Sequence, residues 1–412
     1  MRLLVVSQYF WPENFRINDL VAEMVLRGHE VTVLTGIPNY PEGQVHSEFL
    51  RSPDRFFEWA GAEIVRAPIL ARGHGAVQLL MNYLSFLISA SVVGVWKLRG
   101  RHFDAIFVCQ LSPITSALPA VLLRAIKRTP MVMWVLDLWP ESLSAVGAIR
   151  SKWMLSMVGR LVSFIYKHCD LILAQSNSFR PAIKRLAGPE QLVEYFPAWA
   201  EAIFSNEKIE PAAEIPFSPN SFNVMFAGNI GDGQDFPSIL KAAEILRLEP
   251  EIRWLIVGHG RAAAWLTTEI ERRGLTDKVI MLGRHPLERM PSFFQRADVF
   301  LVALKDEPIF AMTIPGKIQT YLATGIPVVA MLNGEGAKLL SETGSGLVSS
   351  AGDAEGLAQS VLALYHMSPD DRRVMGARGK TTYLREFERT MLMDKAEHWL
   401  MNLKLKSSSL IS

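Results

Sequence analysis

The sequence is poor in cysteine, and the two cysteines that it has lie far apart. Cys109 and Cys169 are the only ones among 412 residues, and neither belongs to a CxxC or Cys/His pattern. This excludes a disulfide framework and a cysteine-based zinc site. Both lie in apolar, strand-like surroundings, so we expect buried thiols in a cytoplasmic protein. The opening residues, MRLLVVSQYFWPE, agree with this, because a strand with early polar residues differs from a signal peptide.

The chain also lacks a large excess of charge of either sign. Its net charge is +2, with 49% hydrophobic and 20% charged residues, which argues against global disorder. A pI near 8.4 is modest for a nucleic-acid-binding protein, and no stripe of basic and aromatic residues accompanies it. The charge is uneven, however: residues 1–200 carry a net +5 and the remainder −3. The basic half fits an acidic partner or an anionic membrane face, or is an uneven solvated surface.

No GxGxxG motif appears, which argues against an ordinary dinucleotide-binding Rossmann site. Strands and helices nevertheless alternate in two series, separated at residues 205–220 by a Pro-, Ser-, Asn- and Glu-rich linker. The predicted strands cover residues 3–7, 30–35, 64–67, 105–109, 131–136 and 171–174, then 222–227, 253–257, 279–282, 299–303 and 327–330. We therefore predict an α/β protein of two doubly wound, Rossmann-like domains that face a cleft. The domains are residues 1–204 and 221–389, and residues 390–412 form a last helix.

Residues 76–96 contain no charged side chain, and their length and apolarity suit a membrane-spanning helix. The strands predicted on both sides belong to one sheet, however, so a single span would divide the domain. Polar residues recur at helical spacing and predict an amphipathic helix; they are Gln78, Asn82, Ser85 and Ser89. We expect a helix that lies on its domain, either at a membrane interface or buried by the domain itself. At an interface, lipid headgroups would contact the basic residues that follow it, Lys97, Arg99 and Arg101.

The most informative run is residues 308–329, PIFAMTIPGKIQTYLATGIPVV. A loop opens a helix near Pro315, Lys317 stands in its first turn, and the helix ends at Gly325 before a β-branched strand. The unpaired N–H groups and dipole of a helix N-terminus favour phosphate, and a lysine there adds a full charge. The run predicts a diphosphate site that includes Pro315, Gly316 and Lys317, although a loop and helix of this kind in an α/β sheet can also bind nothing.

Glycine follows several strands of the second series. The run FAGNIGDGQDF places Gly228, Gly231 and Gly233 between a strand and a helix, and VGHG places Gly258 after the next strand. Glycine lets the backbone approach a phosphate or sugar closely. The third strand is followed by LGRHP, with Arg284 and His285 at the same edge.

Polar and aromatic loops end three strands of the first series. They are SQYFWPENFRIND, with Asn14 and Arg16, TGIPNYPEG, with Asn39 and Tyr40, and DLWPES, with Asp137. Ligands of α/β folds bind at the carboxyl ends of strands, so these loops are candidates for a second binding site. Asp137 is either a site carboxylate or a helix cap.

Taken together, these strings and the segments RGHEVTVLTG and YFPAW resemble the bacterial branch of glycosyltransferase family 4. The resemblance covers nearly the whole chain. It implies a retaining transferase of the GT-B fold that builds lipopolysaccharide (O-antigen), capsule or exopolysaccharide. It further implies a nucleotide-sugar donor, UDP- or GDP-linked, on the C-terminal domain, and an acceptor, typically a polyprenyl diphosphate sugar, on the N-terminal one. The last helix would return to the N-terminal domain, and the enzyme would be cytoplasmic, peripheral on the inner face of the membrane.

The resemblance also assigns roles to residues. Lys317 would neutralise the leaving diphosphate, and Asp137 would act with it in catalysis. The donor would be bound by Gly228, Asn229, Gly231, Gln234, Gly258, His259, Arg284, His285, Pro315, Gly316, Gln319 and Thr320. The acceptor would be bound by Asn14, Arg16, Asn39 and Tyr40. No cofactor and no metal are expected, since no DxD-like run ends a strand.

The chain departs from the family pattern at several places. The two glutamates that the family carries before its final strand are replaced by Met312 and Thr320, and Glu307 is near the first place but off register. The second glutamate holds the ribose in the family; here Gln319 or Thr320 would do so through neutral hydrogen bonds. The family's PSK is PGK, YFPNW is YFPAW, and Gln-Gly after GNIG is Gln234-Asp235.

The chemistry favours front-face attack, with the donor phosphate taking the acceptor proton, because no carboxylate is well placed as a nucleophile. A sugar-nucleotide epimerase on the same fold is an alternative, as is a non-catalytic nucleotide-sugar-binding module, which the missing glutamates favour. No motif supports the pyridoxal-binding lysine that a phosphorylase needs.

Overall fold

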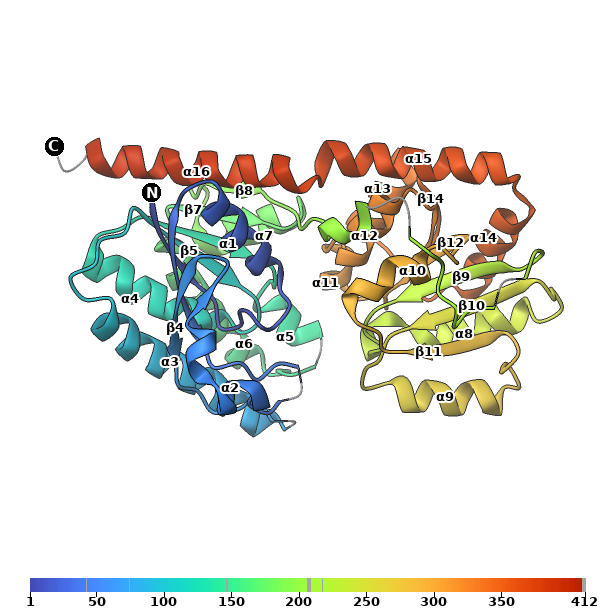
Figure 1. The fold of residues 1–412 in the computed structure, drawn as a ribbon, viewed down its shortest axis with the longest axis horizontal. Helices are drawn as coiled ribbons and strands as arrows, with labels where there is room; N and C mark the ends of the chain where they lie inside the picture. The colour runs from blue at the N-terminus through green and yellow to red at the C-terminus, as the bar shows by residue number, and fades with distance from the viewer. Residues whose placement is uncertain (42, 74, 146, 206–208, 217, 410–412) are drawn as a thin grey trace. The chain divides into compact units, whose positions relative to one another are not determined.

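The computed structural model describes residues 1–412 except 42, 74, 146, 206–208, 217 and 410–412. The chain forms two compact units (Figure 1). The first comprises Met1–Pro197 together with Thr390–Ser412, and the second comprises Ala198–Arg389.

The first unit is built on an eight-stranded sheet of order β3-β4-β2-β1-β5-β6-β7-β8. All of its neighbouring strands are parallel except the β3–β4 pair. The strands are β1 (Arg2–Val6), β2 (Glu30–Gly36), β3 (Glu58–Trp59), β4 (Ala62–Ala67), β5 (Ala105–Gln110), β6 (Met131–Val135), β7 (Leu171–Ala174) and β8 (Val193–Tyr195). The continuous apolar runs form central strands because parallel strands covered by helices are buried on both faces.

Helices connect these strands, as the parallel pairing requires, and the last helix of the chain joins this unit without connecting strands. They are α1 (Arg16–Leu26), α2 (Ser47–Arg51), α3 (Ala76–Lys97), α4 (Leu118–Lys127), α5 (Glu141–Ala145), α6 (Lys152–Lys167), α7 (Phe179–Ala187) and the C-terminal α16 (Arg389–Ser409). Short 3-10 turns, η1 (Pro53–Phe56) and η2 (Ile114–Ala117), precede β3 and α4.

The second unit has a six-stranded parallel sheet of order β11-β10-β9-β12-β13-β14. Its strands are β9 (Phe222–Ala227), β10 (Ile252–Val257), β11 (Val279–Gly283), β12 (Val299–Ala303), β13 (Val328–Met331) and β14 (Gly346–Ser349). Its helices are α8 (Phe236–Ile245), α9 (Ala263–Arg272), α10 (Met290–Phe294), α11 (Pro308–Ala311), α12 (Gly316–Thr324), α13 (Glu335–Thr343), α14 (Ala354–His366) and α15 (Pro369–Glu386), with 3-10 turns η3 (Ala202–Ser205), η4 (Asp232–Gln234) and η5 (Leu287–Arg289).

Alternate residues of β9 serve two different cores in this unit. Val224 and Phe226 pack with α8, α9 and α14, whereas Met225 and Ala227 pack with α10, α12 and α15. Side chains alternate across a strand, so a sheet with apolar residues at consecutive positions must be covered on both faces. The second unit is therefore doubly wound, as predicted.

The boundary between the units lies earlier than the predicted one. Ala200 and Phe204 belong to the core of the second unit, and so do Ala212 and Ile215 from within the expected linker, residues 205–220. Composition alone indicated a linker, but its few apolar side chains are buried against the second sheet. Residues 206–208 and 217 of that stretch lie outside the described residues.

Helix α16 packs on the first unit. The Arg27 guanidinium contacts the carboxylates of Asp394 and Glu397, each at 2.7 Å, and His29 Nε2 lies 2.7 Å from Glu397 Oε1. Arg27 and His29 hold the pKa of Glu397 below its usual range. The ring of Trp399 meets Phe196 edge-on.

Helix α3 turns its polar side toward its own domain, which the sequence did not predict. Asn82 is fully buried, donates to the Leu70 carbonyl (2.6 Å) and accepts from Gln8 Nε2 (2.7 Å). The outer side of the helix is an exposed apolar stripe: Val77, Leu80, Met81, Leu84, Ile88, Val92 and Trp96. Of the two alternatives, a helix buried by its own domain does not describe this face, which is exposed.

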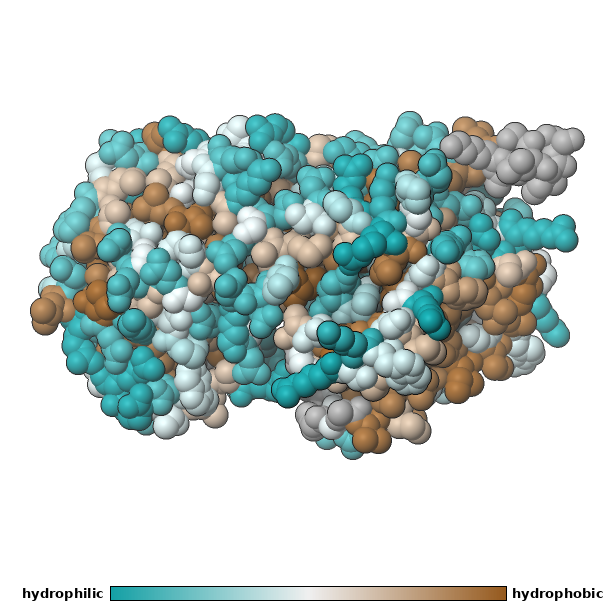
Figure 2. All heavy atoms as spheres, turned by 180° about the vertical axis from the view of Figure 1, so that it is seen from behind, coloured by the Kyte–Doolittle hydropathy of each residue, from teal (hydrophilic) through white to brown (hydrophobic). Residues whose placement is uncertain are grey.

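By length and composition α3 could cross a membrane, with Val77–Lys97 only 22% buried. The flanking strands β4 and β5 belong to one sheet, so a crossing would divide that sheet. In the space-filling view, hydrophobic side chains gather on the outer and lower surface of the first unit, on the side of α3, α4 and α6 (Figure 2).

Candidate functional site

The candidate site of the second unit lies at the carboxyl edge of its sheet, where Lys317 from α12 meets the end of β9. Lys317 Nζ lies 3.8 Å from the ring centroid of Phe226. A Cβ at position 228 would stand 2.6 Å from Lys317 Cε, so the glycine there makes room for the lysine. Gly228 thus leaves room for a cation. The close approach to a ligand that the sequence suggested for this glycine stays a prediction.

The ammonium of Lys317 has no anionic partner among the residues that the structure describes, for no salt bridge or hydrogen bond joins it to them. Its environment is a half-buried one over an aromatic ring. Burial lowers the pKa of Lys317 to about 7, because desolvation disfavours the charged form. A bound anion would raise the pKa of Lys317 again and keep its ammonium charged, so this position is suited to binding a diphosphate.

The remaining glycines at this edge join two loops to each other. A Cβ on Gly258 would lie 1.9 Å from the Gly228 carbonyl oxygen, and one on Gly260 would lie 2.2 Å from that of Ile230. Backbone hydrogen bonds run alongside, from Gly228 N to Val257 O (2.8 Å) and from Ile230 N to His259 O (3.0 Å). These glycines are therefore required by packing between loops, whatever else the loops bind.

Several other predicted donor residues are exposed at these loops. Asn229, His259, Arg284 and Gly316 are exposed, and Pro315 is the N-cap of α12. The edge therefore combines Lys317 with the free N–H groups of a helix N-terminus and with polar side chains from three loops.

Three predicted donor residues have structural partners. Gln234 Oε1 accepts from Gly231 N (3.0 Å), and His285 packs on Phe293 at 4.3 Å between centroids while its Nε2 lies 2.9 Å from the Leu282 carbonyl. Gln319 is buried, and its amide end lies 2.7 Å from the Pro315 carbonyl oxygen, where the neighbouring acceptors favour the orientation in which the amide nitrogen donates. We therefore do not retain a ribose contact for Gln319.

Thr320 contacts the carboxylate of Glu201, which no sequence pattern indicated as a site residue. Its hydroxyl lies 3.3 Å from Glu201 Oε2 and 3.3 Å from the Gly316 carbonyl. Glu201 follows the YFPAW segment, more than a hundred positions earlier in the chain. No local pattern could have paired the two residues, because the contact is made only by the fold.

In the first unit, Glu13 organises the carboxyl edge. Its buried carboxylate accepts backbone N–H groups from Phe10 (3.2 Å), Asn39 (2.7 Å) and Tyr40 (2.7 Å). Burial raises the pKa of Glu13, while these three hydrogen bonds oppose the rise. The carboxylate joins the loop after β1 to the loop after β2.

The predicted acceptor residues lie in and around the two loops that the Glu13 carboxylate joins. Asn39 is buried, and its Oδ1 accepts from Arg72 N (3.0 Å), so its role is structural. Tyr40 belongs to an aromatic cluster with Tyr9 and Phe15, with centroids 5.2 to 5.6 Å apart. Asn14 is exposed and Arg16 is half-buried in the same loop.

Asp137 is not a helix cap. Helix α5 begins only at Glu141, and Asp137 Oδ2 accepts from Trp139 Nε1 at 2.9 Å. The second oxygen of the carboxylate accepts no hydrogen bond from the described residues, so Asp137 remains a candidate for binding a hydroxyl. Within the described residues, no group of three or more His, Cys, Asp or Glu is arranged to hold a metal ion.

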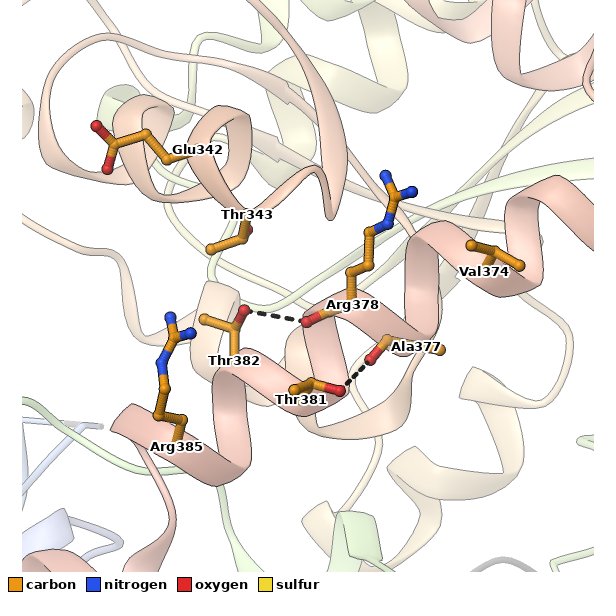
Figure 3. Close-up of a pocket in the computed structure, with 8 residues that line it drawn as sticks. All are labelled: Glu342, Thr343, Val374, Ala377, Arg378, Thr381, Thr382 and Arg385. Carbon is orange, nitrogen blue, oxygen red and sulfur yellow. Dashed lines mark hydrogen bonds between the residues drawn. The ribbon is translucent and has the colours of Figure 1, made fainter.

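A surface hollow of the second unit lies elsewhere. About 500 Å³ in volume, it is lined by α13 and α15, with Arg378 and Arg385 on its wall (Figure 3). Thr381 and Thr382 hydroxyls donate to carbonyls of their own helix. Because α13 runs back from the end of β13 to the start of β14, this hollow is at the amino edge of the sheet, away from Lys317.

Comparisons with known proteins agree with this geometry. The family model described as "Glycosyl transferase 4-like domain" matches residues 14–199, and "Glycosyl transferases group 1" matches residues 221–367. The chain is 26% identical over 344 residues to the putative colanic acid biosynthesis glycosyl transferase WcaI of Escherichia coli (strain K12), covering 79% of this chain and 82% of that protein.

Solved structures show the same fold. Sucrose-phosphate synthase from Thermosynechococcus elongatus has a TM-score of 0.73 at 15% identity, with 98% of each chain covered. Anabaena HepE, solved in complex with UDP-glucose, has a TM-score of 0.66 at 15% identity, covering 98% of this chain and 100% of that one. The chain therefore belongs to the bacterial family 4 glycosyltransferases of surface-polysaccharide biosynthesis and has the GT-B fold.

Proposed function

We propose that this enzyme transfers a sugar from a UDP- or GDP-linked donor to a glycan carried by a polyprenyl diphosphate, with retention at the anomeric carbon. The observation that carries the donor assignment is Lys317: a half-buried cation with a lowered pKa, without an anionic partner in the described chain, at the N-terminus of α12. A diphosphate supplies the missing charge. That HepE has been solved with UDP-glucose on a similar fold supports a nucleotide-sugar here.

The proposed chemistry follows the charges. Breaking the bond between sugar and diphosphate develops negative charge on the leaving group, which Lys317 and the N–H groups of α12 stabilise. A double displacement would need a carboxylate nucleophile beside the sugar, and Lys317 has no carboxylate neighbour within ion-pair distance among the described residues. We favour front-face attack, in which the acceptor oxygen gives its proton to a donor phosphate oxygen. Asp137 orients the acceptor. The scheme uses no metal ion and no resident cofactor.

Glu201 supplies a carboxylate where α12 carries Thr320. The resemblance places a ribose-binding glutamate at position 320, and here the Thr320 hydroxyl lies 3.3 Å from Glu201 Oε2. We assign to Glu201 the hydrogen bonds that the missing glutamate would make to the donor ribose. Although threonine stands at position 320 in place of the family's glutamate, the site would then still contain a carboxylate, that of Glu201.

The exposed stripe of α3 supports peripheral attachment to the inner face of the membrane. This stripe is apolar, whereas Asn82 and Ser85 bond to the domain, an arrangement suited to an apolar phase. Lys97 and Arg99, exposed at its C-terminal end, complement anionic lipid headgroups.

The test is a panel of UDP- and GDP-sugars, each with and without membranes that carry lipid-linked acceptor. We expect labelled sugar in the lipid fraction with one donor only, and retained configuration in the product. A donor that binds without release of nucleotide under any condition would overturn the proposal in favour of a non-catalytic module. Isomerised free nucleotide-sugar would identify an epimerase.

A further inference from the structure

Arg72 occupies an unusual environment at the carboxyl edge of the first sheet. Its Nη1 donates to the Tyr9 hydroxyl (3.3 Å), and its guanidinium lies 5.3 Å from the ring centroid of Tyr40. Its backbone N–H donates to Asn39 Oδ1 (3.0 Å), which fixes the loop. The side chain is half-buried among aromatic groups.

Three other partly buried arginines of this unit are satisfied by acceptors within the protein. Arg27 contacts Glu397 and Arg124 contacts Asp170. Arg66, the most buried, donates to the carbonyls of Phe56, Gly36 and Trp11. By contrast, no carboxylate or carbonyl of the described residues accepts from the Arg72 guanidinium. A guanidinium has five N–H donors in a planar fork that matches a phosphate, so most of its capacity is open.

The groups beside Arg72 complement an anion that is linked to a sugar. Tyr9 and Tyr83 interact electrostatically with Arg72, and Tyr83 also with Asp137, which places the four side chains in one neighbourhood. Burial raises the pKa of both tyrosines, so their hydroxyls stay protonated and able to donate. Asp137 provides an acceptor for hydroxyl groups.

An exposed apolar surface begins next to this cluster. Leu70, two residues before Arg72, is half exposed and is tied to α3, since its N–H donates to Ser85 Oγ (3.0 Å) and its carbonyl accepts from Asn82 (2.6 Å). The first turns of α3 continue the surface with Val77, Met81 and Leu84. The Arg72 guanidinium thus lies close to one end of this exposed apolar surface.

We infer that Arg72, with Tyr9 and Tyr40, binds the diphosphate of a lipid-linked acceptor whose hydrocarbon chain lies along Leu70 and the first turns of α3. The inference rests on the proposed function for the identity of that acceptor. The site would place the sugar attached to the diphosphate near Asp137. The guanidinium fork would bind the phosphate groups. The apolar surface of Leu70 and α3 would bind the hydrocarbon chain, so we expect an amphiphile to be preferred over a free anion.

The test is binding of farnesyl diphosphate to the full-length protein, with farnesol, inorganic pyrophosphate and phosphatidylglycerol vesicles as comparison probes. We expect Arg72→Gln to weaken farnesyl diphosphate binding about tenfold to a hundredfold, the scale of a lost charge-assisted hydrogen bond. Arg72→Lys, which keeps the charge and loses the fork, should fall between. Arg51→Gln is the matched control, since Arg51 is exposed on α2 and its guanidinium, within the part of the chain that the structure describes, bonds only Ser47. Farnesol should bind weakly to every variant.

Several outcomes would overturn the inference. They are equal binding by the wild type and Arg72→Gln, no binding by the wild type, and pyrophosphate or vesicles alone binding as strongly and with the same dependence on Arg72. Donor hydrolysis, measured on the same variants, separates this from the proposed function. If the donor is hydrolysed but farnesyl diphosphate binding does not depend on Arg72, the inference fails and the proposed function stands. If the wild type does not hydrolyse any donor, the proposed function is refuted, and the binding experiment alone decides the role of Arg72. Thermal unfolding and nucleotide binding confirm that each variant is folded.

Discussion

The carboxyl edges of the two sheets have the same topology but different side chains. In the second unit, glycines bring two loops into contact and leave one lysine over a phenylalanine ring. In the first unit, tyrosine, phenylalanine and a buried glutamate fill the loops, and the open cation is an arginine between aromatic rings. The difference is what the proposed function requires: a lysine at a glycine-lined edge for a compact, highly charged soluble donor, and an arginine at an aromatic edge for an amphiphilic acceptor.

The largest expected effect comes from removing the cation of the second unit. Lys317→Ala should lower turnover about 100-fold or more, the scale of one lost transition-state donor. The measurement is the initial rate at saturating donor and acceptor. Lys338→Ala, an exposed lysine on α13, should leave the rate unchanged, and equal rates for the two variants would refute the role of Lys317.

The same lysine predicts a pH dependence with a definite sign. Burial lowers the Lys317 pKa to about 7 in the free protein, so the fraction that carries the charge falls as pH rises through that value. Donor KM should therefore rise above about pH 7, and Lys317→Arg should flatten the profile because arginine stays protonated. A flat wild-type profile from pH 6 to 9 would contradict this.

An intermediate effect is expected from Gly228→Ala. The added Cβ would stand 2.6 Å from Lys317 Cε, and the flexible lysine end would move before the backbone does. We expect turnover to fall about tenfold, the cost of a misplaced group near the chemistry, with donor binding still detectable by calorimetry. Gly274→Ala is the control, because that glycine also has a positive φ but nothing lies within 4 Å of its Cβ. If the two variants lose activity equally, Gly228 has no special link to Lys317.

The apolar character of the first unit can be tested on α3. Leu84→Asp with Ile88→Asp should lower binding to anionic vesicles at least tenfold, since a buried leucine contributes about 1.5–3 kcal/mol. Both side chains are exposed, so the unfolding midpoint should stay nearly constant. A sedimentation assay measures the bound fraction. Leu248→Asp, at an exposed leucine of the second unit, should bind vesicles as the wild type does. If it loses as much vesicle binding as the α3 variant, α3 is not a specific membrane-binding surface.

The smallest effect is expected from the carboxylate that replaces the missing glutamate. Glu201→Gln should raise donor KM a few-fold while kcat changes little, because it weakens one hydrogen bond to the ribose rather than to the leaving group. Saturation kinetics with the preferred donor separate the two parameters. A change in kcat alone, with donor KM constant, would place Glu201 outside the ribose site.

Much of the fold was predictable from local patterns. Continuous apolar runs such as residues 105–109 predicted parallel strands buried on both faces, and Gly325 predicted the end of α12, where it adopts a φ of 75°. The linker was less predictable, since Ala212 and Ile215 become core residues only when the second sheet is present. The direction of α3 was also beyond pattern analysis, because polar residues at helical spacing do not say which face points outward.

The sequence by itself determined the family, the two doubly wound domains and Lys317 at the start of a helix, because strand periodicity, glycine positions and motif order are local properties. Tertiary structure alone decided the environments of the side chains. It brought Glu201 to Thr320, left Arg72 without an acidic partner among the described residues, and buried Gln319. The physical reason is that burial, desolvation and charge pairing depend on residues distant in the chain, which only the folded structure brings together.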